Sequence, residues 1–427
     1  MRGTTGEDRA GGGTADGTAG GRLTEGATTG AAADGDAAAR LATALAGLTP
    51  WPEDGSRADG PVAVDATDRL LLDEARPLLA AARPGDVVVL GDRFGALTLG
   101  ALALGAPDVR VHTDAVTAEA AVRHHLARTG DAGRVAVHAA LGPDLLRGAR
   151  VVLLQLPPSL GELQEVAEHV ARAAADDVVL LAGGRVKHMT RAMNDVLAAE
   201  LRQVRATLAR QKSRGLVASG LRPERRDAPS AFPVIATLTD PELRSAAGVQ
   251  RVAVAAHGGT FAGAALDLGT RFLLTTAPRW RTDVADAVDL GCGTGLLAAV
   301  LALRTPAARV VATDRSAAAV ASARATAQAN GVADRVAVVR DDAGAGLPDA
   351  SADLVVLNPP FHDRTSVRTD AAHRMFATAG RVLRPGGELW TVFNTPLRYR
   401  TALTRAVGPT EHVAQDPRFT VTRSVRG

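Results

Sequence analysis

Short apolar runs alternate with longer segments of helical period from about residue 51 to the end of the chain. Runs such as Val87–Leu90 and Val151–Leu154 are apolar at every position, which is typical of parallel strands covered on both faces. Helical segments such as Leu163–Ala175 separate them. The alternation predicts an α/β protein with mostly parallel sheets. The expected strands are Val87–Leu90, Val135–Val137, Val151–Leu154, Val178–Leu181, Val288–Leu290, Val310–Ala312, Val336–Val339, Leu354–Leu357 and Glu388–Val392.

The pattern restarts near residue 288 and indicates an internal repeat. Four segments match at separations of 200 to 202 residues: Val88–Gly91 with Val288–Gly291, Thr113-Asp114 with Thr313-Asp314, Arg134–Val137 with Arg335–Val338, and Leu156–Ser159 with Asn358–Phe361. Ordered matches at nearly one period indicate a duplication. We therefore expect two tandem doubly wound domains, over residues 46–228 and 229–427. Residues 1–45 are expected to be a disordered tail rich in Gly and Ala, with 11 glycines in the first 36 residues.

Composition excludes several function classes. Hydrophobic residues make up 46% of the chain, and no apolar run approaches the roughly 18 residues of a membrane-spanning helix. The first ten residues lack the basic-then-apolar pattern of a secretion signal. One cysteine, Cys292, excludes an intramolecular disulfide and a multi-cysteine metal site. We therefore expect a cytoplasmic protein with no metal and no membrane contact.

A glycine-rich loop follows the expected strand Val288–Leu290. Asp289 precedes three glycines with G-x-G-x-G spacing, Gly291, Gly293 and Gly295, and a helical segment follows. Glycines at such a turn let the backbone approach a ligand closely. The spacing fits S-adenosylmethionine better than a dinucleotide, whose last glycine would fall one position later.

Acids at the ends of the next two strands complete this expected site. Asp314 lies 19 residues after Gly295, where an acid binds ribose hydroxyls in this geometry. Asp341 and Asp342 follow the third strand, and we favour Asp342 as the acceptor for the adenine amino group. Cys292 is interpreted as a small packing residue of the loop, because no activating base lies near it in sequence.

Asn358-Pro359-Pro360-Phe361 comes directly after the strand Leu354–Leu357, at the edge where this fold binds ligands. A ring-conjugated amine is a poor nucleophile because its lone pair is delocalised. The Asn358 side-chain oxygen and the Pro359 carbonyl can accept its two hydrogens, while Phe361 stacks on the ring. The motif therefore predicts methylation of an amine by positioning and hydrogen bonding.

The first copy lacks these residues. Val89 stands in place of Asp289, Arg93 in place of Gly293, Leu156 in place of Asn358 and Ser159 in place of Phe361. We infer that the first copy is degenerate and non-catalytic, and that it positions substrate and supports the second copy. A basic window between residues 201 and 226 is compatible with phosphate contacts or with a solvated surface held by ion pairs.

The second half resembles the bacterial ribosomal RNA guanine-N2 methyltransferases of the "methyltransferase small" domain group. The resemblance rests on Leu266–Phe272, Asp289–Gly295, Asn358–Asp363, Arg384–Leu389 and Ala414–Phe419. It implies tandem class I (Rossmann-like) domains of which the second binds S-adenosylmethionine, and methyl transfer to guanine N2 in ribosomal RNA, free or in an assembling subunit. Leu90–Leu97 and Leu156–Leu160 favour the large-subunit enzyme. The roles of Asn358, Pro359, Pro360 and Phe361 are those described above.

Two other classes of function stay open on the sequence. An enzyme of the same fold acting on adenine N6, a glutamine amide or a small amine is one, although such Asn-Pro-Pro loops usually end in Tyr. A non-catalytic RNA-binding or assembly protein is the other, and the intact glycine loop argues against it. The sequence does not indicate an oligomeric state.

Overall fold

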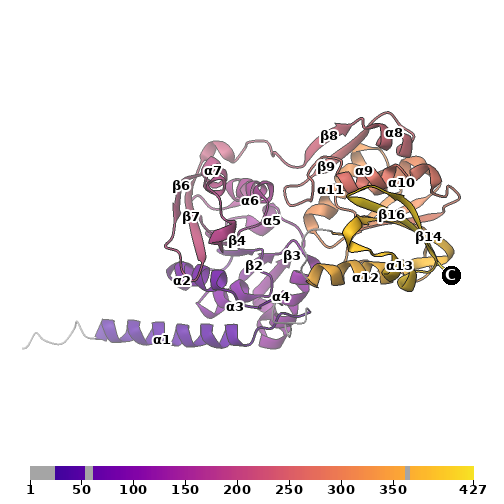
Figure 1. Cartoon of the computed structure of the whole chain (residues 1–427). Coiled ribbons are helices and arrows are strands. Elements are labelled where there is room, and N and C mark those ends of the chain that lie inside the picture. The colour runs from indigo at the N-terminus through magenta and orange to yellow at the C-terminus, as the bar shows by residue number, and fades with distance from the viewer. Residues whose placement is uncertain (1–24, 53–60, 361–365) are drawn as a thin grey trace, which may run out of the picture.

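The computed structural model describes residues 25–52, 61–360 and 366–427, and these form two α/β domains that lie side by side (Figure 1). Each domain has a seven-stranded sheet with helices on both faces. The two sheets have one strand order, β3-β2-β1-β4-β5-β7-β6 in the first and β12-β11-β10-β13-β14-β16-β15 in the second. The predicted pair of doubly wound, mostly parallel domains is therefore confirmed.

The first five strands of each sheet are parallel, and the last two are antiparallel to their neighbours. The first sheet contains β1 (Val87–Leu90), β2 (Val109–His112), β3 (Val135–His138), β4 (Val151–Gln155), β5 (Val179–Arg185), β6 (Leu201–Ala206) and β7 (Ser213–Leu221). The second contains β10 (Asp286–Leu290), β11 (Arg309–Asp314), β12 (Val336–Arg340), β13 (Ala352–Leu357), β14 (Leu383–Asn394), β15 (Thr410–Gln415) and β16 (Phe419–Val425).

An antiparallel hairpin of β8 (Val234–Leu238) and β9 (Val252–Ala256) leads from the first domain into the second. The boundary expected at residues 228–229 falls in the connection between β7 and β8. The helices of the first domain are α1 (Glu25–Ala46), α2 (Ala66–Ala80), α3 (Ala96–Ala103), α4 (Val116–Thr129), α5 (Pro143–Leu146), α6 (Leu160–Ala173) and α7 (Arg191–Glu200). Those of the second are α8 (Pro241–Ala247), α9 (Leu268–Leu274), α10 (Leu296–Arg304), α11 (Ala317–Ala329), α12 (Ser366–Val382) and α13 (Arg400–Ala406).

Small aliphatic side chains fill the core on both faces of each sheet. The central strands β1 and β10 carry Val, Leu and Ala and bury them fully, as parallel strands covered by helices require. Aromatic packing is concentrated in the second domain, where the Trp280 and Trp390 ring centroids lie 6.3 Å apart. None of the helices in the described part of the chain is long and apolar enough to span a bilayer.

The N-terminal segment differs from the expectation of a disordered tail over residues 1–45. Glu25–Ala46 forms α1, and its last turns pack on α3. Leu41 and Leu45 lie one helical turn apart and are buried in the core of the first domain. The sequence pattern hid this helix because only its C-terminal end carries large apolar residues. Residues 1–24 lie outside the described part of the chain.

Candidate active site

A cleft of about 1370 Å³ runs between the two domains along the carboxyl ends of the second domain's parallel strands. Its walls include residues from both domains. The second domain contributes Gly291–Thr294, Thr313–Ser316, Asp341–Ala343 and Asn358–Pro360, and the first domain contributes Asp114, Ala115, Thr117, Pro158, Ser159 and Gly161. Four separate segments singled out in the sequence thus meet in one place.

The glycine-rich loop after β10 forms the floor of this cleft. Gly293 has φ +53°, and a Cβ added there would meet no atom within 4 Å, so this backbone faces open space. Gly295 has φ +75°, and a Cβ there would lie 2.7 Å from the Ala323 Cα of α11. Gly293 therefore leaves room for a ligand, and Gly295 lets helix α11 approach the loop.

Asp314 ties the glycine-rich loop to the end of β11. Its Oδ2 accepts a hydrogen bond from the Gly293 backbone N–H at 3.0 Å, and its Oδ1 accepts from Ser316 N–H at 2.9 Å. Burial raises the pKa of this carboxyl above its ordinary value, and Asp114 adds to the increase. The side chain lines the cleft next to the loop it fixes.

Asp289 lies beneath the loop and does not line the cleft. Its carboxylate is buried and accepts a hydrogen bond from the Ala298 N–H of α10 at 2.9 Å. Burial raises the pKa of Asp289 to about 7. In the first domain Asp92 makes the same contact, accepting from Thr98 N–H at 2.8 Å. The first copy therefore keeps this carboxylate, three positions later than Val89, which simple alignment of the repeat did not reveal.

Asn358, Pro359 and Pro360 follow β13 and line the cleft. The Asn358 Nδ2 group donates to Thr270 Oγ1 at 2.9 Å and to Asp267 Oδ2 at 3.3 Å. The Asn358 Oδ1 atom is buried and has no hydrogen-bond partner among the described residues. Phe361 lies outside the described residues, so its expected stacking role stays a prediction.

The two acids after β12 differ in their surroundings. Asp341 Oδ2 accepts from Gly346 N–H at 2.8 Å and so fixes its own turn. Asp342 lies on the cleft wall, with Arg374 Nη2 at 3.4 Å from its Oδ1. Cys292 also touches the cleft, but burial raises its thiol pKa well above the ordinary value, so it stays protonated at neutral pH.

The first domain holds the hairpin that borders the cleft. Ser159, which stands in place of Phe361, donates from Oγ to the Gly258 carbonyl at 2.9 Å. Glu165 of α6 contacts His257 Nδ1 at 2.6 Å and accepts from Gly258 N–H at 2.8 Å. Ser159, which replaced a motif residue of the second copy, and Glu165 of α6 therefore hold the two domains together.

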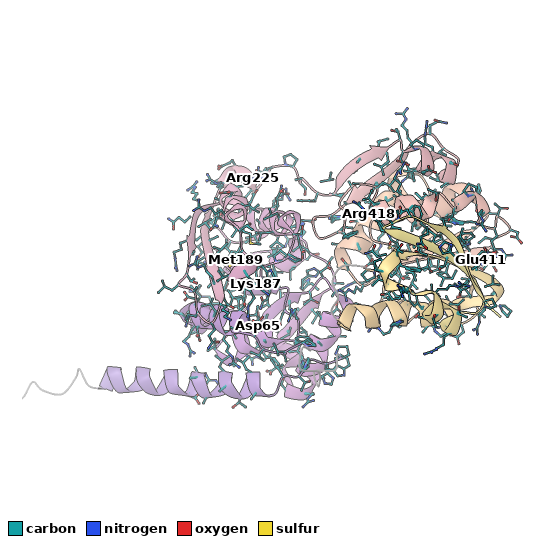
Figure 2. The ribbon with its side chains drawn as sticks, viewed as in Figure 1. Asp65, Lys187, Met189, Arg225, Glu411 and Arg418 are labelled. Atoms are coloured by element: carbon teal, nitrogen blue, oxygen red, sulfur yellow. The ribbon has the colours of Figure 1, made fainter. Side chains whose placement is uncertain are left out.

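The basic window of residues 201–226 divides into two groups. Arg210, Arg225 and Arg226 form ion pairs with acids of the first domain: Asp73 and Glu74, Glu200, and Asp176. Arg225 and Lys187 lie in different parts of that domain (Figure 2). Arg202, Arg205, Lys212 and Arg214 are exposed and have no ion-pair partner among the described residues. The sequence could not separate the two groups, because the acidic partners of Arg210, Arg225 and Arg226 lie in other elements of the fold.

Comparison with known proteins shows where this architecture occurs. Residues 42–222 match a family model described as the RLMG N-terminal domain, and residues 251–423 match the methyltransferase small domain. A solved structure of the 16S rRNA N2 G1207 methyltransferase of T. thermophilus, in complex with AdoMet and guanosine, has a TM-score of 0.66. That comparison covers 89% of this chain and 98% of the other at 22% identity, and it shows the shared fold.

Curated relatives match over nearly their whole length. The ribosomal RNA large subunit methyltransferase G of Streptomyces avermitilis is 37% identical over 394 residues, which cover 88% of this chain and 98% of the relative. The Streptomyces coelicolor protein of that name is 38% identical, with 89% and 97% covered. The Pseudomonas aeruginosa PAO1 protein is 36% identical, with 85% and 93% covered. The chain belongs to the ribosomal RNA large subunit methyltransferase G family and is an S-adenosylmethionine-dependent methyltransferase.

Proposed function

We propose that this chain methylates the exocyclic N2 amine of a guanine in large-subunit ribosomal RNA, in the cytoplasm. The names of its relatives support the RNA substrate. One observation carries the choice of an amine: Asn358 lines the cleft, and its buried Oδ1 atom has no partner in the described structure. A buried acceptor without a partner is costly, so a donor from the substrate is expected to complete it.

The cleft fits S-adenosylmethionine, which supplies an electrophilic methyl group on a sulfonium when bound. The backbone at Gly291 and Gly293 would lie along its methionine portion. Gly295 would serve the site by letting α11 approach the loop, and Asp289 supports the loop from below. Asp314 would hold the ribose hydroxyls at the end of β11, and Asp342 would accept from the adenine amino group. Gly293 is the test of this fit, because any side chain there would enter the space the cofactor needs.

Two acceptors explain how a weak nucleophile can react. Asn358 Oδ1 and the Pro359 carbonyl would accept the two N2 hydrogens, which draws the nitrogen toward sp³ geometry and aims its lone pair at the methyl group. With the amine so held, its nitrogen would form the N–C bond as the S–C bond of the sulfonium breaks, with S-adenosylhomocysteine as the leaving group, and would release one proton to water. Phe361 would stack on the base, which must leave its helix to enter the cleft.

A basic edge of the first domain supports RNA as the substrate. Arg185, Lys187, Lys212 and Arg214 are exposed, and none has an ion-pair partner in the described structure. Val186 N–H donates to the Lys212 carbonyl, which brings the segments together. Leu156 N–H bonds to Gly183, so this edge continues from the Pro158–Ser159 wall of the cleft. We infer that these four cations contact phosphates.

The test uses large-subunit ribosomal RNA from cells that lack this gene. The purified protein and labelled S-adenosylmethionine are added, and the RNA is digested to nucleosides. Label is expected in N2-methylguanosine. An Asn358→Ala variant should lose turnover and keep its affinity for S-adenosylhomocysteine. Label in N6-methyladenosine would assign the adenine reaction instead, and no label in RNA would direct the search to amides and small amines.

A further inference from the structure

We propose that Asp267 and Thr270 are positioning residues that fix the orientation of the Asn358 side-chain amide. The inference rests on the proposed function, because it concerns how the acceptor for the substrate amine is presented. It deepens that function by assigning a role to the segment Leu266–Phe272, which the cofactor and substrate contacts described above do not use.

The orientation of an asparagine amide is not set by its shape, because its oxygen and nitrogen ends are nearly isosteric. If the Nδ2 group faced the substrate, two donors would oppose each other and the amine could not be held. Activity therefore requires that something hold Nδ2 away from the substrate amine. Two groups of α9 and its cap do so: Thr270 Oγ1 at 2.9 Å and Asp267 Oδ2 at 3.3 Å from Nδ2.

The Asp267 carboxylate favours one of the two orientations of the Asn358 amide. An ionised carboxylate is only an acceptor, so turning the Asn358 amide would place two oxygens against each other. Asp267 itself is held in place, because Oδ1 accepts from Gly269 N–H at 2.9 Å and Oδ2 accepts from Thr270 N–H at 3.2 Å as the N-cap of α9. Thr270 is 7% exposed, so its hydroxyl has little access to water.

The helix cap and the amide contact are thus made by the same side chain. This arrangement leaves Asn358 Oδ1 as a buried atom without a partner, in a side chain that lines the cleft. Asp267 and Thr270 are not expected to touch the substrate base. They act through Asn358, and their loss should lower the rate of methyl transfer more than the affinity for RNA or cofactor.

Two substitutions separate this role from a structural one. Thr270→Val keeps the shape of the side chain and removes the hydroxyl, and Thr270→Ser restores it. Asp267→Asn keeps a good N-cap residue but places an amide where only an acceptor stood. We expect Thr270→Val and Asp267→Asn to lower kcat by roughly 10- to 100-fold, less than the roughly 100- to 1000-fold loss seen when a group that contacts the reacting atoms is removed, because both residues act through Asn358. KM for ribosomal RNA and Kd for S-adenosylhomocysteine should change less than about threefold, and Thr270→Ser should recover most of kcat.

A second readout does not depend on turnover. The chain contains four asparagines, Asn194, Asn330, Asn358 and Asn394, so labelling with ¹⁵N-asparagine gives four side-chain amide signals. Asn358→Ala identifies the signal of Asn358. Its two amide protons should shift in Thr270→Val and return in Thr270→Ser.

The outcomes distinguish this inference from the proposed function. Wild-type turnover and unshifted amide protons in Thr270→Val and Asp267→Asn, alongside an inactive Asn358→Ala, would overturn the positioning role alone. Wild-type turnover in Asn358→Ala would overturn the proposed use of Asn358 and the positioning role with it. Binding of S-adenosylhomocysteine checks that each variant is folded.

Discussion

Asp114 of the first domain caps helix α11 of the second domain. Its Oδ1 accepts a hydrogen bond from the Ser316 hydroxyl at 3.0 Å and another from the Ala318 N–H at 2.9 Å. Ala115 and Ser316 also form an antiparallel β-bridge. Asp114 is the counterpart, 200 residues earlier, of Asp314, which we assign to the cofactor ribose. The Asp114 loop of the first copy therefore holds the equivalent loop of the second copy, which follows Asp314.

Arg340 strengthens this contact from the other side. Its guanidinium donates to the Thr113 and Asp114 carbonyls at 2.7 and 3.0 Å and pairs with Glu119 at 2.7 Å. Both side chains of this ion pair are largely buried, with 12% and 15% exposed. The interface therefore positions Arg315 and Ser316, which directly follow Asp314 in the chain.

We predict that Asp114→Ala weakens binding of S-adenosylhomocysteine by about 3- to 10-fold, because two hydrogen bonds of roughly 1 kcal/mol each no longer fix the Asp314 loop. Asp114→Asn keeps an acceptor at Oδ1 and is expected to bind nearly as the wild type. Calorimetric titration measures both. Equal affinity in Asp114→Ala and wild type would show that the first domain does not support the cofactor loop.

The sequence predicted the parallel strands more completely than the antiparallel ones. Every expected strand is present, because each is a short apolar run that the sheet buries. Seven strands were not predicted: β2, β6, β7, β8, β9, β15 and β16. Several of them mix charged and apolar residues, as β6 does with Arg202 and Arg205 beside Leu201 and Val204. Edge and antiparallel strands face water in part, so their sequences lack a continuous apolar signal.

The parts of the site that form a contiguous sequence motif could be predicted. The glycine loop and Asn358-Pro359-Pro360 are such segments, and the fold brings them into one cleft. The partners of Asn358 were not predictable, because Asp267 and Thr270 lie about 90 residues away and are ordinary helix-start residues in sequence. Asp92 was missed for a related reason: a carboxylate can reach the same helix amide from a different position of the loop.

The glycine loop gives a prediction with three matched substitutions. Gly293→Ala should fold but lose S-adenosylhomocysteine binding, because its Cβ would enter the open cleft. Gly295→Ala should lower the free energy of unfolding by at least about 2 kcal/mol, because its Cβ would meet the Ala323 backbone. Gly331→Ala, with φ +68° and free space around its Cβ, isolates the cost of the positive φ, about 1 kcal/mol.

Urea denaturation and calorimetric titration test these three variants together. Normal ligand affinity in Gly293→Ala would place the cofactor elsewhere. If Gly295→Ala were no less stable than Gly331→Ala, the close approach of α11 would have no energetic consequence.

The basic edge predicts a change in the salt dependence of RNA binding. Lys212→Gln combined with Arg214→Gln should weaken binding and reduce the slope of log K against log salt by roughly one to two, as expected when one or two phosphate contacts are lost. Arg210→Gln is the matched control, because Asp73 and Glu74 already neutralise Arg210. Filter binding between 50 and 200 mM salt measures the slopes. An unchanged slope in the double variant would exclude these cations from the RNA interface.

Glu162 predicts how stability depends on pH. Burial raises the pKa of Glu162 to about 7, and Asp114 and Glu165 add to the increase. An unfolded chain ionises this group near pH ~4.3. Between these values the folded state holds a proton that the unfolded state has lost, so the free energy of unfolding falls as pH rises and levels off above pH 7.

Glu162→Gln removes this titration, and among the described residues no hydrogen bond to the Glu162 carboxyl is lost. We expect the variant to match the wild type near pH 4 and to be more stable by up to about 4 kcal/mol at pH 8, since each pKa unit corresponds to about 1.4 kcal/mol. Urea denaturation at pH 5 and pH 8 measures the difference. Glu224→Gln, at an exposed position, is the control and should not alter the pH dependence. A Glu162→Gln protein whose stability falls with pH as steeply as that of the wild type would show that Glu162 does not hold a proton in the folded state.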